Sequence, residues 1–331
     1  MHGREMREDV TQDILVMIEQ FYTPNPYSRF VNDGEVLIAG VGGLGCIWAI
    51  EAHSRCSELS ELLLIDADES SFEGANEANC LYLDAGGEGR GAAALPSMAT
   101  HRLRNGIDSI SSLLDEAEVL ILLTALGGGM GSGASGELAR IANQYGCMVL
   151  SIAGLPFAEQ PLRCSIAEAA IPSLEVNSNV CIRVSMERLA WQSRSRKTNW
   201  MTGSGWIAEL VEGLVTTLAS VGRINLDLMD MRAIINKEGN ATLIVGTGTS
   251  ENPKSVVEMA RNSPLNDIPV EGAKGCMIQV EGGPDMTLAH LTELTDSFVS
   301  SMDPDCQVIM GARVSDEMVG KLRLVAVVSG I

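Results

Sequence analysis

The chain has 331 residues, a length that suits about two domains, and 46% of them are hydrophobic, which is enough for a sizeable core. Its net charge of −20 and the lack of a basic stripe exclude an ordinary nucleic-acid binder, and an aromatic content of 4% favours an aliphatic α/β protein over a β-sandwich. The eight cysteines include no CxxC pair and the four histidines no HExxH motif, so we expect reduced thiols, a cytoplasmic protein and no zinc site.

One helix is predicted ahead of the first strand. In the segment DVTQDILVMIEQFY, residues 9–22, apolar side chains recur near one helical face: Val10, Ile14, Ile18 and Phe21. Lys and Arg are too sparse for a helix that lies on a membrane, and no stretch reaches the ~20 apolar residues that would span one. We expect residues 1–34 to form a helical extension without a secretory leader.

Four apolar segments in the first half of the chain predict buried strands. They are EVLIAG at residues 35–40, ELLLIDAD at 61–68, VLILLTA at 119–125 and CMVLSIAG at 147–154. Helices are predicted over CIWAIEAHSR and GELARIANQYG, whereas residues 69–100 are expected to be irregular. Strands that alternate with helices of about ten residues are typical of a doubly wound parallel sheet. We expect this α/β domain to occupy residues 35–205 and to bind its ligand beyond the carboxyl ends of the strands.

The second half of the chain has a different pattern. The polar, basic stretch WQSRSRKTNW is interpreted as a loop, and WIAELVEGLVTTLASVG, which starts at residue 206, as a long helix. Together with NLDLMDMRAII this helix makes a central segment, residues 206–235. From about residue 236 the apolar strands ATLIVGTGTS, CMIQVEG, CQVIMGARV and LRLVAVVSG alternate with one or two helices. They predict a smaller α+β domain over residues 236–331.

Two glycine-rich turns join predicted strands to predicted helices. They are GVGGLG at residues 40–45 and GGGMGSG at 127–133. Glycine allows a positive φ and a close approach of ligand to backbone, and the following helix offers free N–H groups to a phosphate. Neither turn contains Lys and the GxxxxGK(S/T) loop is absent, so any phosphate must be held by backbone amides, helix dipoles and a metal ion. The alternative is that both segments are tight turns that bind no ligand.

The second turn resembles the GGGTG(S/T)G signature of the tubulin/FtsZ family, and the resemblance runs from about residue 35 to Ile331. GVGGLG is similar to the first phosphate loop of FtsZ, and NLDLMD, residues 225–230, to its catalytic-loop pattern N-x-D-x-x-D. GAKGCMIQVEGGPDMTLAHL and VIMGARVSDEMVGKLRLVAVVSG resemble the FtsZ C-terminal domain. The resemblance implies a cytoskeletal GTPase of the tubulin/FtsZ fold that binds GTP or GDP with Mg²⁺. It also implies head-to-tail protofilaments, in which the catalytic loop of one subunit closes over the nucleotide of the next.

The resemblance assigns most nucleotide contacts to the two turns and the residues that follow nearby strands: Gly42, Gly43, Leu44, Gly45, Asp66, Asp68, Ala94, Gly127, Gly128, Gly129, Met130, Gly131 and Ser132. Glu159 and Arg163 are added from PFAEQPLR, which is one residue shorter than the family's PFxxEGxxR. A helical salt bridge between these two side chains is the alternative. No side-chain cluster is predicted to bind the metal, so Mg²⁺ would be held through the phosphates.

The catalytic roles are also implied by the resemblance. Asp227 and Asp230 would reach the nucleotide of the neighbouring subunit and orient water toward the γ-phosphate with help from the metal, and Asn225 would brace the loop. The spacing of three residues points both carboxylates the same way on a helix. Ordinary capping of a helix N-terminus is the alternative.

Several departures from the family pattern fall in the predicted pocket. Apolar residues replace a Thr of the signature and three Asn residues elsewhere, at Met130, Ile47, Leu95 and Met186. The Asp that reads the guanine edge aligns near Gly205, and its loss would remove charge-assisted hydrogen bonds that are each worth about 1.5–3 kcal/mol. These changes predict a divergent FtsZ-like protein.

Three functions remain open at this point. The first is a polymerising GTPase, and the second is a non-hydrolysing structural protein, or one that co-assembles with another FtsZ-family subunit. The third, a dinucleotide-dependent oxidoreductase, rests on GVGGLG and on Asp66 and Asp68 about twenty residues on, and it leaves the other motifs unexplained. The acidic charge leads us to expect no nucleic-acid partner. The sequence stops at VAVVSGI without the linker and adaptor peptide of FtsZ, either because the protein lacks them or because they have been removed, and in the first case we expect no direct membrane anchor.

Overall fold

The computed structural model describes residues 35–75, 78–83, 95–219, 224, 226–237, 239–265 and 268–331. The predicted N-terminal extension lies outside these residues, and so do Ala94 and Asn225.

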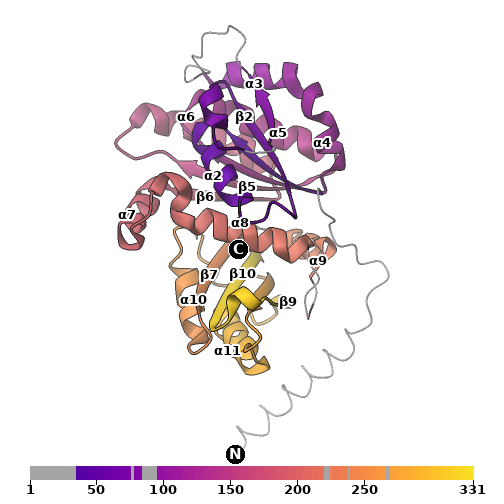
Figure 1. Cartoon of the computed structure of the whole chain (residues 1–331), viewed down its shortest axis with the longest axis vertical. Helices are drawn as coiled ribbons and strands as arrows, with labels where there is room; N and C mark the ends of the chain where they lie inside the picture. Colours follow the sequence, from indigo (N-terminus) through magenta and orange to yellow (C-terminus); the bar gives the residue numbers. More distant parts are fainter. Residues whose placement is uncertain are drawn as a thin grey trace, which may run out of the picture.

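Six parallel strands form the first sheet, in the order β3-β2-β1-β4-β5-β6 (Figure 1). The strands are β1 Val36–Val41, β2 Glu61–Asp66, β3 Asn79–Tyr82, β4 Val119–Ala125, β5 Met148–Leu155 and β6 Val180–Ser185. The four predicted strands correspond to β1, β2, β4 and β5, and the predicted doubly wound parallel sheet is confirmed. The strand order reverses between β1 and β4, so the ligand crevice of such a sheet is expected where these two strands end.

Helices cover both faces of this sheet. They are α2 Gly43–His53, α3 Pro96–Gly106, α4 Ser111–Glu116, α5 Gly129–Gln144, α6 Pro161–Val176 and α7 Met186–Arg196, with short 3₁₀ turns at Glu69–Phe72, Ile107–Ile110 and Trp200–Gly205. On β1, Val36 and Ile38 pack with α2, while Leu37 and Ala39 pack with α3 to α6 on the opposite face. Both faces are buried, which explains why the strands are apolar without alternation.

Three local predictions were wrong. Helix α5 begins at Gly129, so most of the second glycine-rich stretch is the first part of a helix rather than a turn. Helix α7 runs through the basic stretch as far as Arg196, where a loop had been predicted. Residues 69–100 are not wholly irregular, because they contain β3, the first 3₁₀ turn and the start of α3.

A second sheet has four strands in the order β7-β10-β8-β9. They are β7 Ala241–Thr249, β8 Gly275–Gly282, β9 Gln307–Val314 and β10 Lys321–Ser329, accompanied by α10 Pro253–Arg261, α11 Leu288–Val299 and a 3₁₀ turn at Asp316–Met318. β10 pairs antiparallel with β7 and β8, and β8 pairs parallel with β9. The last strand in the sequence is therefore an inner strand of this sheet, and the predicted α+β character is confirmed.

Helix α8, Trp206–Ala219, lies between the two sheets, with α7 at one end and α9, Leu228–Ile235, at the other (Figure 1). Its side chains share one hydrophobic cluster with both sheets. At Gly213 the helix approaches β10 so closely that a Cβ would overlap the Val325 side chain. The predicted central helix thus packs against both sheets.

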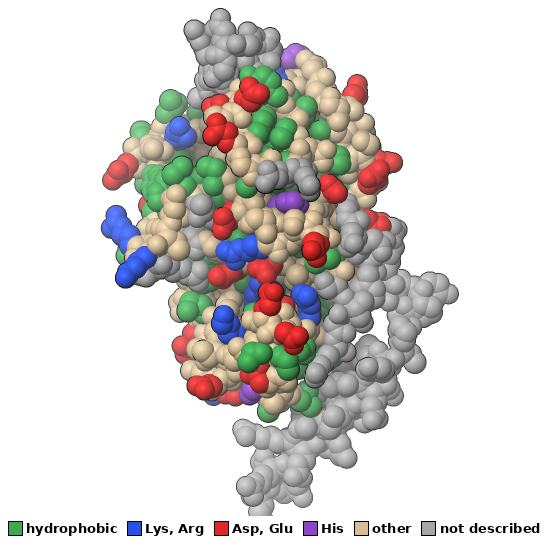
Figure 2. Space-filling view, viewed as in Figure 1, with side chains coloured by type: hydrophobic (Ala, Val, Ile, Leu, Met, Phe, Trp, Pro, Cys, Tyr) green, Lys and Arg blue, Asp and Glu red, His purple; other side chains and the backbone are tan. Residues whose placement is uncertain are grey.

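The surface agrees with the composition. Figure 2 shows acidic side chains scattered over both parts of the visible face, with basic side chains in smaller groups between them. Among the residues that the structure describes, none of the helices is both long and apolar enough to cross a membrane.

Candidate functional site

The two glycine turns follow β1 and β4, the neighbouring strands at the switch point of the first sheet. Gly42 has a φ of 76° and precedes α2, and Gly127 has a φ of 94° and lies two residues before α5. Neither helix has a side-chain cap or an acidic residue in its first turn. The N–H groups and positive dipole ends of two helices therefore lie at the switch point of the sheet, with no acidic residue in the first turn of either helix, an arrangement that suits an anionic ligand.

The two turns are in contact. A Cβ added to Gly42 would lie 3.1 Å from the amide nitrogen of Gly131. The buried Thr124 hydroxyl lies 3.2 Å from the Val41 carbonyl oxygen and 3.3 Å from that of Gly131, so it ties the end of β1 to the start of α5. Because there is no space for side chains, the two backbones form a single surface.

Ser132 serves the turn itself. Its hydroxyl oxygen accepts the Gly127 N–H at 2.8 Å, and the residue is buried. The hydroxyl proton is not used by this bond. Ser132 therefore fixes the shape of the second turn and keeps one donor.

The two acids after β2 differ in their surroundings. Asp66 is buried and accepts hydrogen bonds from the Ala67 N–H at 2.7 Å and the Ser71 hydroxyl at 2.6 Å. Burial raises the pKa of Asp66 above its ordinary value, against the effect of these hydrogen bonds. Asp68 is exposed and caps the short 3₁₀ turn through the N–H and hydroxyl of Ser70. Asp66 lies beside the first turn, because a Cβ on Gly43 would be 3.7 Å from its Oδ2.

The loop from β5 to α6 brings Arg163 to the second turn. A Cβ on Gly127 would lie 2.9 Å from the Arg163 Cβ and from its carbonyl oxygen. Glu159 and Arg163 are both exposed, and Glu159 precedes the first residue of α6, so the alternative of a helical salt bridge does not hold.

Glu187 is a candidate site residue that no sequence motif indicated. Its carboxylate accepts the Ala158 N–H at 2.5 Å and the Ser185 hydroxyl at 3.0 Å. The hydrogen bond from Ala158 lowers the pKa of Glu187. A cleft of ≈ 440 Å³ lies beside this loop, lined in part by Pro156, Cys164 and Glu187. The sequence places this acid two residues after β6, in VSME, at the same sheet edge as the glycine turns, but β6 itself was not predicted.

The apolar replacements do not gather in the pocket. Met130 and Met186 are buried in the hydrophobic clusters on opposite faces of the sheet, and Ile47 is half-buried against one of them. Gly205 ends the 3₁₀ turn before α8 with a φ of 80°. Leu95 is different, because 51% of its surface is exposed and it is the N-cap of α3 without a side-chain hydrogen bond.

Asp227 and Asp230 form a capping box at the start of α9. The Asp227 carboxylate accepts the Asp230 N–H at 2.9 Å, and the Asp230 carboxylate accepts the Asp227 N–H at 3.1 Å. Asp227 is 6% exposed, and burial raises the pKa of Asp230. Both carboxylates are brought to one helix end as predicted, in the geometry of helix capping.

The acids and the glycine turns lie at opposite edges of the first sheet. The Arg232 guanidinium of α9 lies 3.5 Å from the carbonyl oxygen of Gly146, which comes just before β5 begins. Helix α9 is therefore at the amino edge of the sheet, whereas both turns are at its carboxyl edge. Strands of six to eight residues put these edges roughly 20–26 Å apart. One chain alone does not bring the two groups together.

Comparison with known proteins agrees with this architecture. A doubly wound sheet with glycine turns at its switch point, joined by a central helix to a second sheet, is the fold of FtsZ-type GTPase-domain proteins. The sequence model for the Tubulin/FtsZ family, GTPase domain, matches residues 35–192, and that for the FtsZ family, C-terminal domain, matches residues 239–331. The chain belongs to the tubulin/FtsZ family, as a divergent FtsZ-like member. The resemblance found in the sequence is confirmed. The comparisons give no support to the alternative of a dinucleotide-dependent oxidoreductase.

Archaeal FtsZ proteins are similar to this chain over nearly its whole length. Cell division protein FtsZ 1 of Archaeoglobus fulgidus is 28% identical over 330 residues, which cover 98% of this chain and 86% of that protein. Cell division protein FtsZ 2 of Halobacterium salinarum is 29% identical over 336 residues, with 98% and 84% covered.

Solved structures show the same fold. An empty FtsZ dimer from Methanocaldococcus jannaschii has a TM-score of 0.79 at 23% identity, with 97% of this chain and 92% of that chain covered. CetZ2 from Haloferax volcanii, in a GTPγS-bound protofilament, has a TM-score of 0.72 at 18% identity, with 89% and 93% covered.

Proposed function

We propose that this chain binds GTP at the paired glycine turns and assembles head to tail into protofilaments. In these, Asp227 and Asp230 of one subunit complete the hydrolysis site of the next. The observation that carries the proposal is that the turns and the acids lie at opposite edges of one sheet. A heterologous contact between successive subunits joins two such edges and repeats without closing, and so builds a filament.

The nucleotide half of the site rests on backbone groups. The N–H groups at the start of α2 and α5 are free of side-chain caps, and the glycines allow phosphate oxygens to approach them. Gly127 to Ser132 would hold one part of the triphosphate and Gly42 to Gly45 another, with Arg163 beside the second turn. A bound Mg²⁺ would neutralise charge between the phosphates. The described residues contain no group of three His, Cys, Asp or Glu that could hold a metal by itself.

The catalytic half rests on two oriented carboxylates. Each uses one oxygen in the capping box: Oδ1 of Asp227 and Oδ2 of Asp230. The second oxygen of each takes no part in the box and can accept a hydrogen bond from water. The box thus holds two acceptors in fixed directions at the helix end, as needed to orient a nucleophilic water.

A second candidate has two observations in its favour. Leu95 replaces a polar residue and stands exposed at the start of α3, and no acid occupies the guanine-reading position near Gly205. These changes favour a structural protein that assembles without turnover or co-assembles with another FtsZ-family subunit.

One purified sample separates the two candidates. Nucleotide released on denaturation is identified by chromatography, and phosphate release from GTP with Mg²⁺ is followed across protein concentrations. Bound guanine nucleotide, with turnover per subunit that rises steeply with concentration, is the expected result. If the sample contains no bound nucleotide and shows no turnover at any concentration, the GTPase proposal is refuted and the structural one remains.

Two variants and a control test the shared site. Asp227→Asn keeps a good N-cap and removes the charge, so it should abolish turnover and keep both the fold and GTP binding. Asp227→Ala should lose turnover and destabilise α9 as well. Asp115→Ala, at an exposed acid of α4, is the matched control and should behave as the original chain.

A further inference from the structure

Leu95 occupies a position that does not suit it locally. The N-cap of a helix favours Ser, Thr, Asp or Asn, and an apolar residue there typically lowers the stability of the helix by about 1 kcal/mol. Leu95 is the N-cap of α3, makes no side-chain hydrogen bond there and is 51% exposed. Neither helix capping nor core packing accounts for this leucine.

The surroundings of Leu95 place it beside the glycine-rich start of α5. A Cβ on Gly133 would overlap the carbonyl oxygen of Pro96, the residue that follows Leu95. Met98, one turn further along α3, is also exposed. The carboxyl edge of the sheet therefore carries an apolar rim, Leu95 and Met98, next to the backbone surface of the turns.

Met229 is an exposed apolar side chain at the opposite edge of the first sheet. It is the second residue of α9, between Asp227 and Asp230, and is 59% exposed. Its neighbours Leu228 and Met231 are buried. Met229 lies in the first turn of α9 together with both acids, so a partner that covers the N-terminal end of this helix comes close to Met229.

We propose that Leu95 of one subunit packs against Met229 of the next, so that an apolar contact supports assembly beside the nucleotide. The inference rests on the proposed head-to-tail arrangement, in which the acids of α9 face the glycine turns of the neighbouring copy. In this arrangement a second copy of this chain covers each of the two exposed side chains. Removing water from both side chains stabilises the contact in proportion to the apolar area buried.

The test uses the critical concentration for assembly, measured by sedimentation with GTP and Mg²⁺. Leu95→Asn supplies a favoured N-cap, so the monomer should keep or raise its melting temperature. The same change should raise the critical concentration about tenfold, the size expected for the loss of one well-buried apolar side chain. Met229→Ala, which keeps good helix propensity, should raise it to a similar degree.

The double variant tests whether the two residues touch each other. If they are partners, Leu95→Asn with Met229→Ala should raise the critical concentration no further than the stronger single change does. Turnover per subunit should recover in either single variant at high protein concentration, which it would not do in Asp227→Asn. Met259→Ala, at an exposed methionine of α10, is the matched control and should leave assembly unchanged.

The outcomes are distinguishable. If the original chain forms protofilaments but both single variants stay within about twofold of it, the apolar contact is refuted while the proposed function stands. If the two effects multiply in the double variant, the side chains act separately and the pairing is wrong. If the original chain does not assemble with GTP at any concentration, the proposed function and the contact fail together.

Discussion

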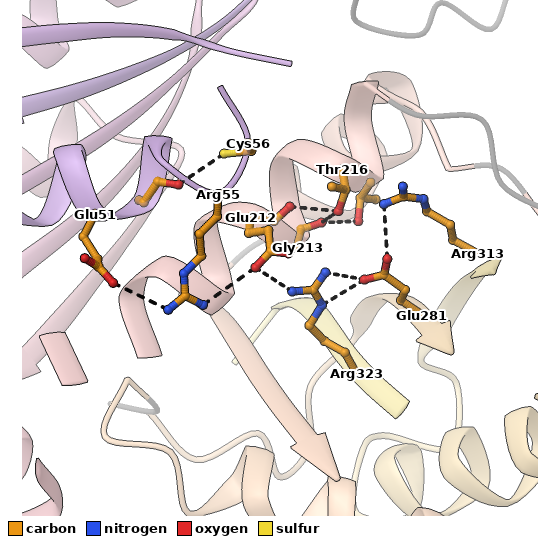
Figure 3. A network of polar contacts seen from close by, with 11 residues as sticks. Glu51, Arg55, Cys56, Glu212, Gly213, Thr216, Glu281, Arg313 and Arg323 are labelled. Atoms are coloured by element: carbon orange, nitrogen blue, oxygen red, sulfur yellow. Dashed lines mark hydrogen bonds and ion pairs between the residues drawn. The ribbon is translucent and has the colours of Figure 1, made fainter. Parts of the chain in front are cut away.

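Arg323 and Glu212 join the C-terminal sheet to the central helix. The Arg323 guanidinium on β10 lies 2.9 Å from the Glu212 carboxylate on α8, and the Arg323 side chain is only 9% exposed (Figure 3). The same guanidinium donates from Nε to Glu281 on β8 at 2.9 Å, and Glu281 also accepts from Arg313 at 3.2 Å. From the other side Arg55, which follows α2, comes within 3.8 Å of Glu212. A chain of ion pairs therefore runs from the first domain through α8 into the second sheet.

Removing Arg323 should destabilise the protein, because Glu281 and Glu212 would lose their shared partner in a largely buried place. We expect Arg323→Ala to lower the free energy of unfolding by about 3 kcal/mol, measured by urea denaturation. Lys254→Ala breaks the exposed ion pair with Glu293 and should change the free energy of unfolding by less than about 1 kcal/mol. Equal losses of unfolding free energy in the two variants would show that the ion pairs of Arg323 contribute no more than an exposed pair does.

Glu137 on α5 predicts a dependence of stability on pH. Its carboxylate accepts hydrogen bonds from Arg104 at 2.7 Å and Arg140 at 2.7 Å, and these lower its pKa to about 2. A pKa that is lower in the folded than in the unfolded chain contributes stability above about pH 4.5, and this is lost as the pH falls toward 2. Glu137→Gln should therefore cost roughly 2 kcal/mol at pH 7 and much less at pH 3.

The control for this pH experiment is Glu116→Gln, at an exposed glutamate of α4. Its difference from the original chain should stay small across the same pH range. A Glu137→Gln deficit that persisted unchanged to pH 3 would contradict the assignment to charge.

Gly42 and Gly74 offer a matched pair for the first glycine turn. Both have positive φ, 76° and 84°, so either change to Ala carries a backbone strain of about 1–2 kcal/mol. A Cβ at Gly42 would press on Gly131 at 3.1 Å, whereas Gly74 has nothing within 4 Å. We expect Gly42→Ala to weaken GTP binding at least about tenfold, measured by calorimetry, and Gly74→Ala to leave it intact. Similar affinities in the two variants would mean that contact between the turns is unimportant for the ligand.

Glu187 should act by positioning the loop that carries Glu159. Glu187→Ala removes the acceptor of the Ala158 N–H, so the loop should become more accessible to protease and GTP affinity should fall about fivefold. Glu187→Gln keeps an acceptor and should recover most of the affinity. Glu168→Ala, on the same cleft, is the control. A loss of affinity as large in the Gln variant would point to charge rather than positioning.

The sequence predicted the strands that are long and apolar, and missed those that are short or at an edge. β3 has four residues and one buried side chain, Leu81, so it has no readable period. β6 is an edge strand in which exposed Arg183 interrupts the apolar pattern. Both strands exist because the neighbouring strand supplies their hydrogen bonds, which is information that a local pattern lacks.

The second glycine stretch shows why a site is harder to predict than a fold. A single sequence cannot separate a glycine needed for positive φ from one needed for close approach. Of these glycines Gly127 has positive φ, whereas Gly131 and Gly133 lie in α5, where a Cβ would overlap the carbonyl oxygens of Ala125 and Pro96. Likewise Met130 and Met186 are core residues, so their apolar character does not by itself imply an eroded pocket.

The inner position of β10 has a consequence for how the protein is made. β7 pairs with β10 alone, and some seventy residues separate the end of the one from the start of the other. During synthesis on the ribosome, β7 emerges long before its partner, so this sheet cannot close until residues 321–329 have left the exit tunnel. The first sheet, complete by Ser185, can form much earlier. The apolar strand β7 is therefore without its partner strand in the nascent chain for a long time, and it can pack early against α8, the first domain and α10, which follows it directly.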